Sequence, residues 1–322
     1  MKRRWTAYIL IFLLLFQGTA VSEETETVYQ LVSSKHKLYD LAGTGWLIEP
    51  WKIYFVPDAA ITQAESFNKV TGAFKKLDTY VYLVDSSRSM NMDDMKADSA
   101  LWSLIREHYP QSTVGHLKPE SVEDYCKYFY KTDHHWNYRG SYEGYKAIIR
   151  MMLGENEPLL EPAETVEFNV TFNGSYNKLL KRKNCDEQFT VYRFEYPSMT
   201  VRINGKVKKS YGMQESYFAG RINRQAFTNH YEGFYGGDEG LLELCTDDNS
   251  KENVIVFGNS FSNSIAMLIA SHFNHSYFID MRHYKDDMGQ KLDLTASIKK
   301  WKISKIVLMG DPYFFKWGTT YR

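Results

Sequence analysis

Two short segments of this sequence hold the residue types that nucleophilic catalysis needs. The first segment contains Asp133 and His135, and the second, much farther along the chain, contains Ser260. A serine hydroxyl is unreactive at neutral pH unless a base takes its proton and a third group orients that base. An aspartate, a histidine and a serine can fill these roles if the fold brings them together.

The spacing of the acid and the two adjacent histidines favours His135 as the base. In an extended segment, Asp133 and His135 project to one side and His134 to the other. A carboxylate beside an imidazole fixes its tautomer and stabilises the imidazolium that forms when it accepts a proton. Two other interpretations stay open: a polar loop capped by Asp133, and a metal site. No further ligand falls at a typical spacing, so we expect neither a metal nor a cofactor.

The serine follows an apolar run and a glycine, and it precedes a stretch with helical character. This order exposes the Ser260 hydroxyl on a tight turn and places backbone N–H groups where an oxyanion would form. Gly258, Asn259 and Asn263 are therefore candidate oxyanion or substrate-binding residues. Alternatively, Asn259 and Ser260 simply cap a helix. The turn differs from the G-x-S-x-G motif because Ser262 replaces the second glycine.

Three further residues are candidates for substrate binding. Arg282 and Tyr284 follow a predicted strand that ends at Asp280, and they could bind an anionic or hydroxyl-rich ligand. Trp136 is either a packing anchor or a platform for a sugar. The serines between positions 86 and 89 are less favoured as nucleophiles, because no glycine opens their turn.

The elements that must position these residues follow an alternating order of strands and helices. Helical spacing is found at residues 59–76, 92–108, 120–128, 141–153, 262–273 and 294–301, and strand-like runs are found at 79–84, 112–117, 253–257, 276–280 and 305–309. This order predicts an α/β fold, a three-layer α/β/α sandwich with a mostly parallel, five-stranded sheet. Active sites in such sheets lie at the carboxyl ends of the strands, where both segments are expected.

The middle of the chain has a different pattern. Residues 155–250 contain alternating, β-rich stretches separated by Asn, Gly and Pro, which predict an antiparallel insertion. We therefore expect residues 23–154 and 251–322 to form one domain that this β-rich insertion interrupts.

The composition indicates a folded chain without a strong overall charge. Of the 322 residues, 43% are hydrophobic and 16% aromatic, enough to bury one large core or two modest ones. Lys plus Arg equals Asp plus Glu at 39 each, so we expect no nucleic-acid partner. The three cysteines, Cys126, Cys185 and Cys245, fit no zinc-site spacing and are too few for a disulfide scaffold.

Residues 1–22 have the order of a secretory signal. A basic start is followed by an apolar run and then by small residues. The apolar run is shorter than the ~20 residues that span a bilayer. We expect an exported protein, extracellular or on the cell surface, with either a cleaved signal peptide or an uncleaved signal anchor.

The residues around the candidate triad also resemble a known family. They are Thr132 to Asn137 with Gly140, Gly258 to Asn263, Gly45 to Leu47, Phe172 to Ser175, and Val307 with Leu308. Their types and order resemble the bacterial DHHW family, which is similar to the alginate O-acetyltransferase proteins and belongs to the SGNH-hydrolase-like superfamily. One departure is Asn259, where the family often has an acid.

The resemblance implies a Ser-His-Asp triad in which the acid and base precede the serine. By position, Ser260 matches the nucleophile, His135 the base and Asp133 its orienter. It also implies acetylation of an exported polysaccharide, in some members with acetyl groups supplied by a membrane-bound acyltransferase. Three functions follow as hypotheses: an O-acyltransferase acting on a glycan, an SGNH-type carbohydrate acetylesterase, and a non-catalytic glycan-binding or assembly protein.

Overall fold

The computed structural model describes residues 29–49, 56–181, 186–222 and 229–322. The predicted signal segment, residues 1–22, and Cys185 lie outside the described residues. Within these ranges, Cys126 and Cys245 are free cysteines. No helix in the described part of the chain has the length and apolar character needed to cross a membrane.

A large mixed sheet organises the described part of the chain. Its strands are β4 (Asp78–Val84), β5 (Thr113–Leu117), β8 (Thr200–Ile203), β9 (Lys206–Lys208), β10 (Leu241–Cys245), β11 (Asn253–Phe257), β12 (His275–Ile279) and β13 (Lys305–Gly310). Their order in the sheet is β5-β4-β13-β11-β12-β10-β8-β9. The pairings from β5 through β12 are parallel, and those from β12 to β9 are antiparallel.

The predicted mixed α/β fold with a mostly parallel sheet is confirmed, but the number of strands was wrong. The five expected strands form the parallel part, and three antiparallel strands extend it to eight in the described residues. The parallel strands could be predicted from the sequence because a strand such as β11 is apolar and buried along most of its length. The added strands are short or partly polar, and β9 is exposed throughout. The bounds proposed for the insertion, 155–250, stay a prediction.

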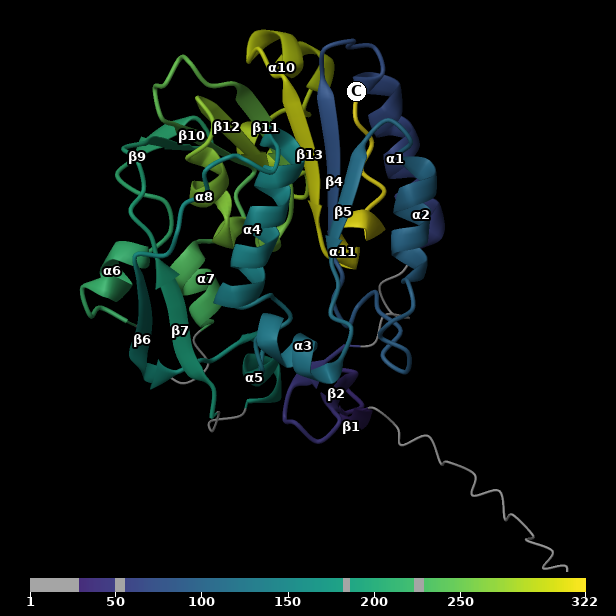
Figure 1. Cartoon of the computed structure of the whole chain (residues 1–322), viewed down its shortest axis with the longest axis vertical. Coiled ribbons are helices and arrows are strands. Elements are labelled where there is room, and N and C mark those ends of the chain that lie inside the picture. The colour runs from purple at the N-terminus through teal and green to yellow at the C-terminus, as the bar shows by residue number, and fades with distance from the viewer. Residues whose placement is uncertain (1–28, 50–55, 182–185, 223–228) are drawn as a thin grey trace, which may run out of the picture.

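Helices cover both faces of this sheet (Figure 1). One face packs against α4 (Tyr138–Leu153) and α8 (Ala266–Ala270), and the other against α1 (Pro57–Thr71), α2 (Ala100–His108), α10 (Leu294–Lys300) and α11 (Pro312–Lys316). Strand periodicity explains the division, since Tyr80 and Tyr82 of β4 join the first core and Val81 and Leu83 join the second.

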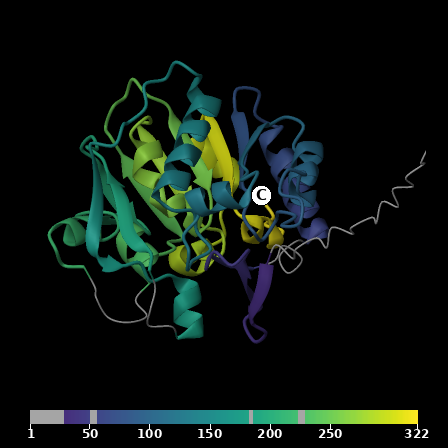
Figure 2. The same ribbon diagram turned by 60° about the horizontal axis from the view of Figure 1, so that its bottom comes forward.

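The smaller elements complete the molecule. They are β1 (Tyr29–Ser33), β2 (Leu38–Leu41), β3 (Leu47–Ile48), β6 (Glu164–Thr171), β7 (Gln188–Arg193), α3 (Val122–Tyr128), α5 (Ser175–Leu180), α6 (Gln214–Phe218), α7 (His230–Tyr235), the 3-10 helix η2 (Ser260–Ser264) and α9 (Tyr284–Met288). Strands β1 to β3 form a small sheet and β6 pairs with β7. Near the end of β13 that leads into α11 lie α3, α5 and the small sheet (Figure 1), an arrangement also visible in Figure 2.

Candidate active site

The serine lies where β11 gives way to a short 3-10 helix. Asn259 caps this helix, since its side-chain oxygen accepts a hydrogen bond from Phe261 N–H at 3.4 Å. The backbone N–H of Gly258 donates to the carbonyl of Ile279, at the end of the neighbouring strand β12. A Cβ at Gly258 would lie 2.8 Å from Ser262 Oγ, so glycine lets the turn close tightly. Ser260 therefore begins the helix at the carboxyl edge of the sheet.

The acid and the base lie on the segment that joins α3 to α4. Trp136 anchors this segment, because its indole is fully buried and its Nε1–H donates to Ser264 Oγ at 2.8 Å. The indole packs so closely on α4 that a Cβ at Gly144 would lie 2.4 Å from its ring. Asn137 starts α4 by accepting hydrogen bonds from two N–H groups of its first turn. Trp136 and Asn137 thus hold this segment against the core, next to the 3-10 helix that carries Ser260.

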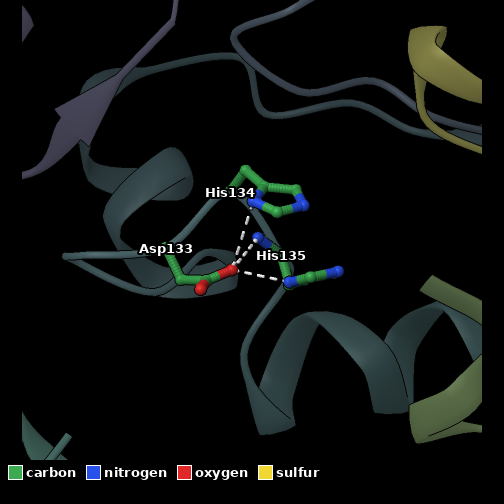
Figure 3. Close-up of side chains that lie close together, drawn as sticks. All are labelled: Asp133, His134 and His135. Carbon is green, nitrogen blue, oxygen red and sulfur yellow. Dashed lines mark hydrogen bonds and ion pairs between the residues drawn. The ribbon is translucent and has the colours of Figure 1, made fainter. Parts of the chain in front are cut away.

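The structure brings Asp133, His135 and Ser260 into one continuous chain of hydrogen bonds. Nδ1 of His135 lies 2.6 Å from Asp133 Oδ1, and Nε2 of His135 lies 2.7 Å from Ser260 Oγ. The backbone N–H of His135 also donates to Asp133 Oδ1, at 3.0 Å (Figure 3). An ionised carboxylate at Nδ1 fixes the proton there, so Nε2 is left to accept the proton of the serine hydroxyl.

Asp133 is buried but held as a carboxylate. Its second oxygen, Oδ2, accepts a hydrogen bond of 2.6 Å from Ser175 N–H at the start of α5. Burial alone would raise the pKa of this carboxyl. The positive charge that His135 takes on protonation, with the hydrogen bonds from His135 and Ser175, outweighs burial and holds the pKa of Asp133 well below its usual range. The carboxylate is therefore ionised at neutral pH.

Close packing around Gly174 places the start of α5 against this carboxylate. A Cβ at Gly174 would lie 2.3 Å from the Thr132 carbonyl oxygen and 2.6 Å from Asp133 Cβ. The N–H of Gly174 donates to Thr132 Oγ1 at 3.2 Å, and that of Tyr176 donates to Thr132 O at 3.0 Å. A residue without a side chain is required here for α5 to reach the acid.

The adjacent histidine has a different environment. His134 Nδ1 lies 3.1 Å from Ser175 Oγ, and the ring lines the same cavity as Ser260. Burial, together with the nearby positive charge of Arg88, holds the pKa of His134 well below its usual value. His134 is therefore a neutral ring beside the site at neutral pH.

Tyr231 of α7 was missed by the sequence reasoning, although it contacts both the histidine and the serine residue. Its ring stacks on His135, with centroids 3.8 Å apart and an angle of 4° between planes. Its hydroxyl donates to the Ser260 carbonyl oxygen at 2.9 Å. Residues 155–250 contain many tyrosines, and no motif distinguished this one.

A cavity of about 580 Å³ opens over the serine. Of the predicted binding residues, Asn259, Asn263 and Arg282 line it. The Asn263 amide donates to Asp238 Oδ1 at 3.1 Å, and Arg282 forms ion pairs with Asp238 and Asp280. These side chains form an organised polar wall beside Ser260.

Three predicted residues do not contact this cavity in the way we expected. Trp136 is fully buried as a packing anchor, so it cannot be a platform for a sugar. Tyr284 is also buried, within the hydrophobic cluster on the other face of the sheet, because α9 begins there. Gly258 cannot donate its N–H to an oxyanion, since that N–H already pairs with Ile279.

A buried ion-pair network connects the serine turn to two other strand ends. Arg88, after β4, pairs with Asp311, after β13, at 2.9 Å, and with Glu49 at 2.5 Å. Asp311 also accepts a hydrogen bond of 2.8 Å from the side-chain amide of Asn259. Arg88 lines the cavity and was missed by the sequence reasoning, although its place after a predicted strand could have marked it.

The alternative nucleophiles at positions 86, 87 and 89 are buried within their own turn. Ser89 Oγ donates to the Ser86 carbonyl, and Ser87 Oγ accepts from Glu49 N–H. Their hydroxyls therefore support the loop that carries Arg88.

Two groups of side chains in the described residues have the composition of a metal site. One is Asp133 with His134 and His135, and the other is Asp238 with Asp280 and His283. In the first, both ring nitrogens of His135 lie within hydrogen-bond distance of other groups. In the second, both carboxylates pair with Arg282. His135 in the first group and the two carboxylates of the second group thus already have protein partners.

Comparisons with known proteins agree with this fold. The DHHW protein family matches residues 96–279. Bacillus cereus PatB1, solved with a sulfonyl adduct, has a TM-score of 0.64 at 16% identity over 86% of this chain and 98% of that chain. A DHHW family protein from Eubacterium siraeum has a TM-score of 0.64 at 18% identity over 86% and 91%. No match was found among curated proteins.

Proposed function

Because the chain belongs to the DHHW protein family, we propose that its site is that of an exported serine O-acyltransferase, which transfers acetyl groups to a polysaccharide. The observation that carries the proposal is the chain of contacts from Asp133 through His135 to Ser260, at 2.6 Å and 2.7 Å, below an open cavity. This arrangement supplies a base, an orienter and a nucleophile that lines the cavity, as acyl transfer requires.

In the first half of the reaction, Ser260 takes an acetyl group from the donor. His135 Nε2 accepts the hydroxyl proton while Ser260 Oγ attacks the carbonyl carbon. The tetrahedral intermediate then collapses, the bond to the donor's leaving group breaks, and that group takes the proton from His135. The products are acetyl-Ser260 and the deacylated donor.

The negative oxygen of the intermediate needs a hydrogen-bond donor near Ser260. Among the described residues, no acceptor lies within hydrogen-bond reach of the Ser260 backbone N–H, which begins the 3-10 helix. We assign this N–H to the oxyanion, because a preorganised backbone donor stabilises developing charge. Asn259 and Asn263 then hold the turn through Asp311 and Asp238.

In the second half, a sugar hydroxyl replaces the donor. His135 accepts the hydroxyl proton as the sugar oxygen attacks the acetyl carbon, and the collapse returns the proton to Ser260 Oγ. The products are an O-acetylated glycan and the free serine. A membrane-bound acyltransferase is the proposed acyl donor, as the family resemblance implies. The proposal that the protein is exported is based on the signal-like pattern of residues 1–22.

Transfer is tested by supplying 4-nitrophenyl acetate as donor and a soluble oligosaccharide as acceptor. We expect O-acetylated oligosaccharide, detected by mass spectrometry, at a rate above that of free acetate release. Ser260→Ala should abolish both products, whereas Ser250→Ala, at an exposed serine outside the cavity, should change neither.

Two other outcomes of this experiment would support the alternative functions. Acetate release without acetylated sugar, dependent on Ser260, would identify an acetylesterase whose acceptor is water. Neither product from the folded wild-type protein, with the oligosaccharide still bound, would favour the non-catalytic glycan-binding function.

A further inference from the structure

Two grooves adjoin the active-site cavity at different walls. The first, here named the Trp317 groove, measures about 470 Å³ and shares Arg282 with the cavity. The second, the Lys206 groove, measures about 750 Å³ and shares Asn229, Glu232, Gly236 and Gly237 with it. No described residue lines both grooves, and the cavity that Ser260 lines shares a different set of residues with each of them. This series of cavities can hold a chain that extends beyond the reacting sugar in two directions.

The Trp317 groove is strongly basic. Lys285, Lys291 and Arg322 line it, together with Arg282. Its described lining residues include no aspartate or glutamate. Arg282 is neutralised by Asp238 and Asp280, but no described carboxylate forms an ion pair with the other three cations. Their charge is therefore available to a ligand.

An aromatic contact connects this groove to the active-site cavity. The indole of Trp317 is 54% exposed, which is unusual for so large an apolar side chain. Its ring meets that of Tyr313 at 5.5 Å in an edge-to-face contact, and Tyr313 lines the cavity over the serine. An exposed indole beside tyrosine offers a flat apolar surface to the C–H face of a sugar ring.

The Lys206 groove adds cations on its own side of the cavity. Lys178, Lys206 and Lys208 line it, with two carboxylates, Glu232 and Glu239. No described carboxylate forms an ion pair with any of the three lysines. Basic side chains thus line both grooves that adjoin the cavity of Ser260, although the chain as a whole has no formal net charge.

We propose that the acyl acceptor is an acidic polysaccharide that lies across the cavity and both grooves. Its acidic groups contact Lys285 and Lys291 on one side and Lys206 and Lys208 on the other, and a sugar ring packs on Trp317. The reacting hydroxyl then belongs to a sugar within the chain, because the polymer continues past Ser260 in both directions. This inference rests on the proposed acyl transfer and specifies its acceptor.

Binding is tested on the full chain carrying Ser260→Ala, so that the readout does not depend on catalysis. The ligands are polygalacturonate, galacturonate trimers and dextran, compared by isothermal titration calorimetry. We expect polygalacturonate to bind more tightly than either other ligand. Lys285→Gln with Lys291→Gln, or Lys206→Gln with Lys208→Gln, should each weaken binding about tenfold, the scale of losing two exposed ion pairs. Trp317→Ala should weaken it as well.

The matched control is Lys299→Gln with Lys300→Gln, two exposed lysines of α10 that line neither groove. The proposal would be overturned if this control lost as much affinity for polygalacturonate as the groove variants do. It would also be overturned if dextran, or oligothymidylate of the same charge, bound as tightly as polygalacturonate. Acetyl transfer to a neutral acceptor, unaffected by the groove variants, would overturn the acidic acceptor while the proposed function stands. Groove-dependent binding without any acetyl transfer would support the groove and reject the proposed function.

Discussion

Asp133 is the single residue whose charge matters most to the proposed mechanism. It is buried, yet its carboxylate accepts hydrogen bonds from His135 and Ser175 that keep its pKa low. A buried carboxylate held ionised beside an imidazole stabilises the imidazolium that forms when the serine loses its proton. The proposed mechanism therefore depends on the charge of Asp133 as well as on its shape.

Asp133→Asn tests that dependence directly. The amide has nearly the same shape, but it has no charge and can reverse the tautomer of His135. We expect kcat for acetyl transfer to fall by about 10³–10⁴-fold, with KM changed little. Asp186→Asn, at an exposed carboxylate that pairs with Lys131, is the control. A tenfold or smaller loss in Asp133→Asn would mean that the carboxylate is not the orienter.

Glu187 gives a second prediction, concerning pH and stability. Burial, with a contribution from the charge of Asp133, raises the pKa of Glu187 to about 8. Between the ordinary value near 4.5 and this value, the folded chain holds a proton that the unfolded chain has released. The free energy of unfolding should therefore fall as pH rises from about 5 to about 8, by at most about 1.4 kcal/mol per pH unit.

Glu187→Gln should remove this contribution, because an amide does not titrate. Urea denaturation at several pH values between 5 and 8 measures it, and the variant should gain stability relative to the wild type as pH rises. Glu167→Gln, at an exposed glutamate, should follow the wild type. Parallel curves for wild type and Glu187→Gln would contradict the prediction.

At the scale of elements, the start of α5 provides the clearest test. Gly174 has φ −95° and ψ 179°, values that alanine also adopts, so any cost of Gly174→Ala is steric. The added Cβ would meet Thr132 O and Asp133 Cβ. We expect a loss of about 1–3 kcal/mol in the free energy of unfolding, together with reduced kcat as Asp133 shifts.

Gly237→Ala is the matched control for stability, because a Cβ there would have no neighbour within 4 Å. Thermal unfolding of both variants gives the comparison. An unchanged Tm in Gly174→Ala would show that α5 does not fit closely against the acid.

The elements also show what local sequence patterns can and cannot predict. The five parallel strands and most helices were predictable, because their residue patterns are local in the sequence. Helix α2 was expected from residue 92 but begins at Ala100, where Ser99 supplies the cap. Strand β10 was not predicted. Its short sequence carries Glu243, and its place in the sheet depends on pairing with β8 and β12.

At the scale of the whole molecule, the parallel sheet explains why distant segments meet. Ser260 follows β11, Arg88 follows β4 and Asp311 follows β13, so all three lie at one edge. That convergence of strand ends was predictable in outline. The stacking of Tyr231 on His135 was not, because α7 reaches the site through contacts such as His230 with Asn173, which no local pattern encodes.

The central claim is that His135 activates Ser260 as a nucleophile. The most direct measurement is the rate at which a sulfonyl fluoride modifies the protein, with the modified residue located by peptide mass spectrometry. We predict rapid, single modification of Ser260 in the wild type. His135→Ala, which keeps the serine, should slow the modification by at least about 10²-fold. Modification at another residue, or an unchanged rate in His135→Ala, would contradict the claim.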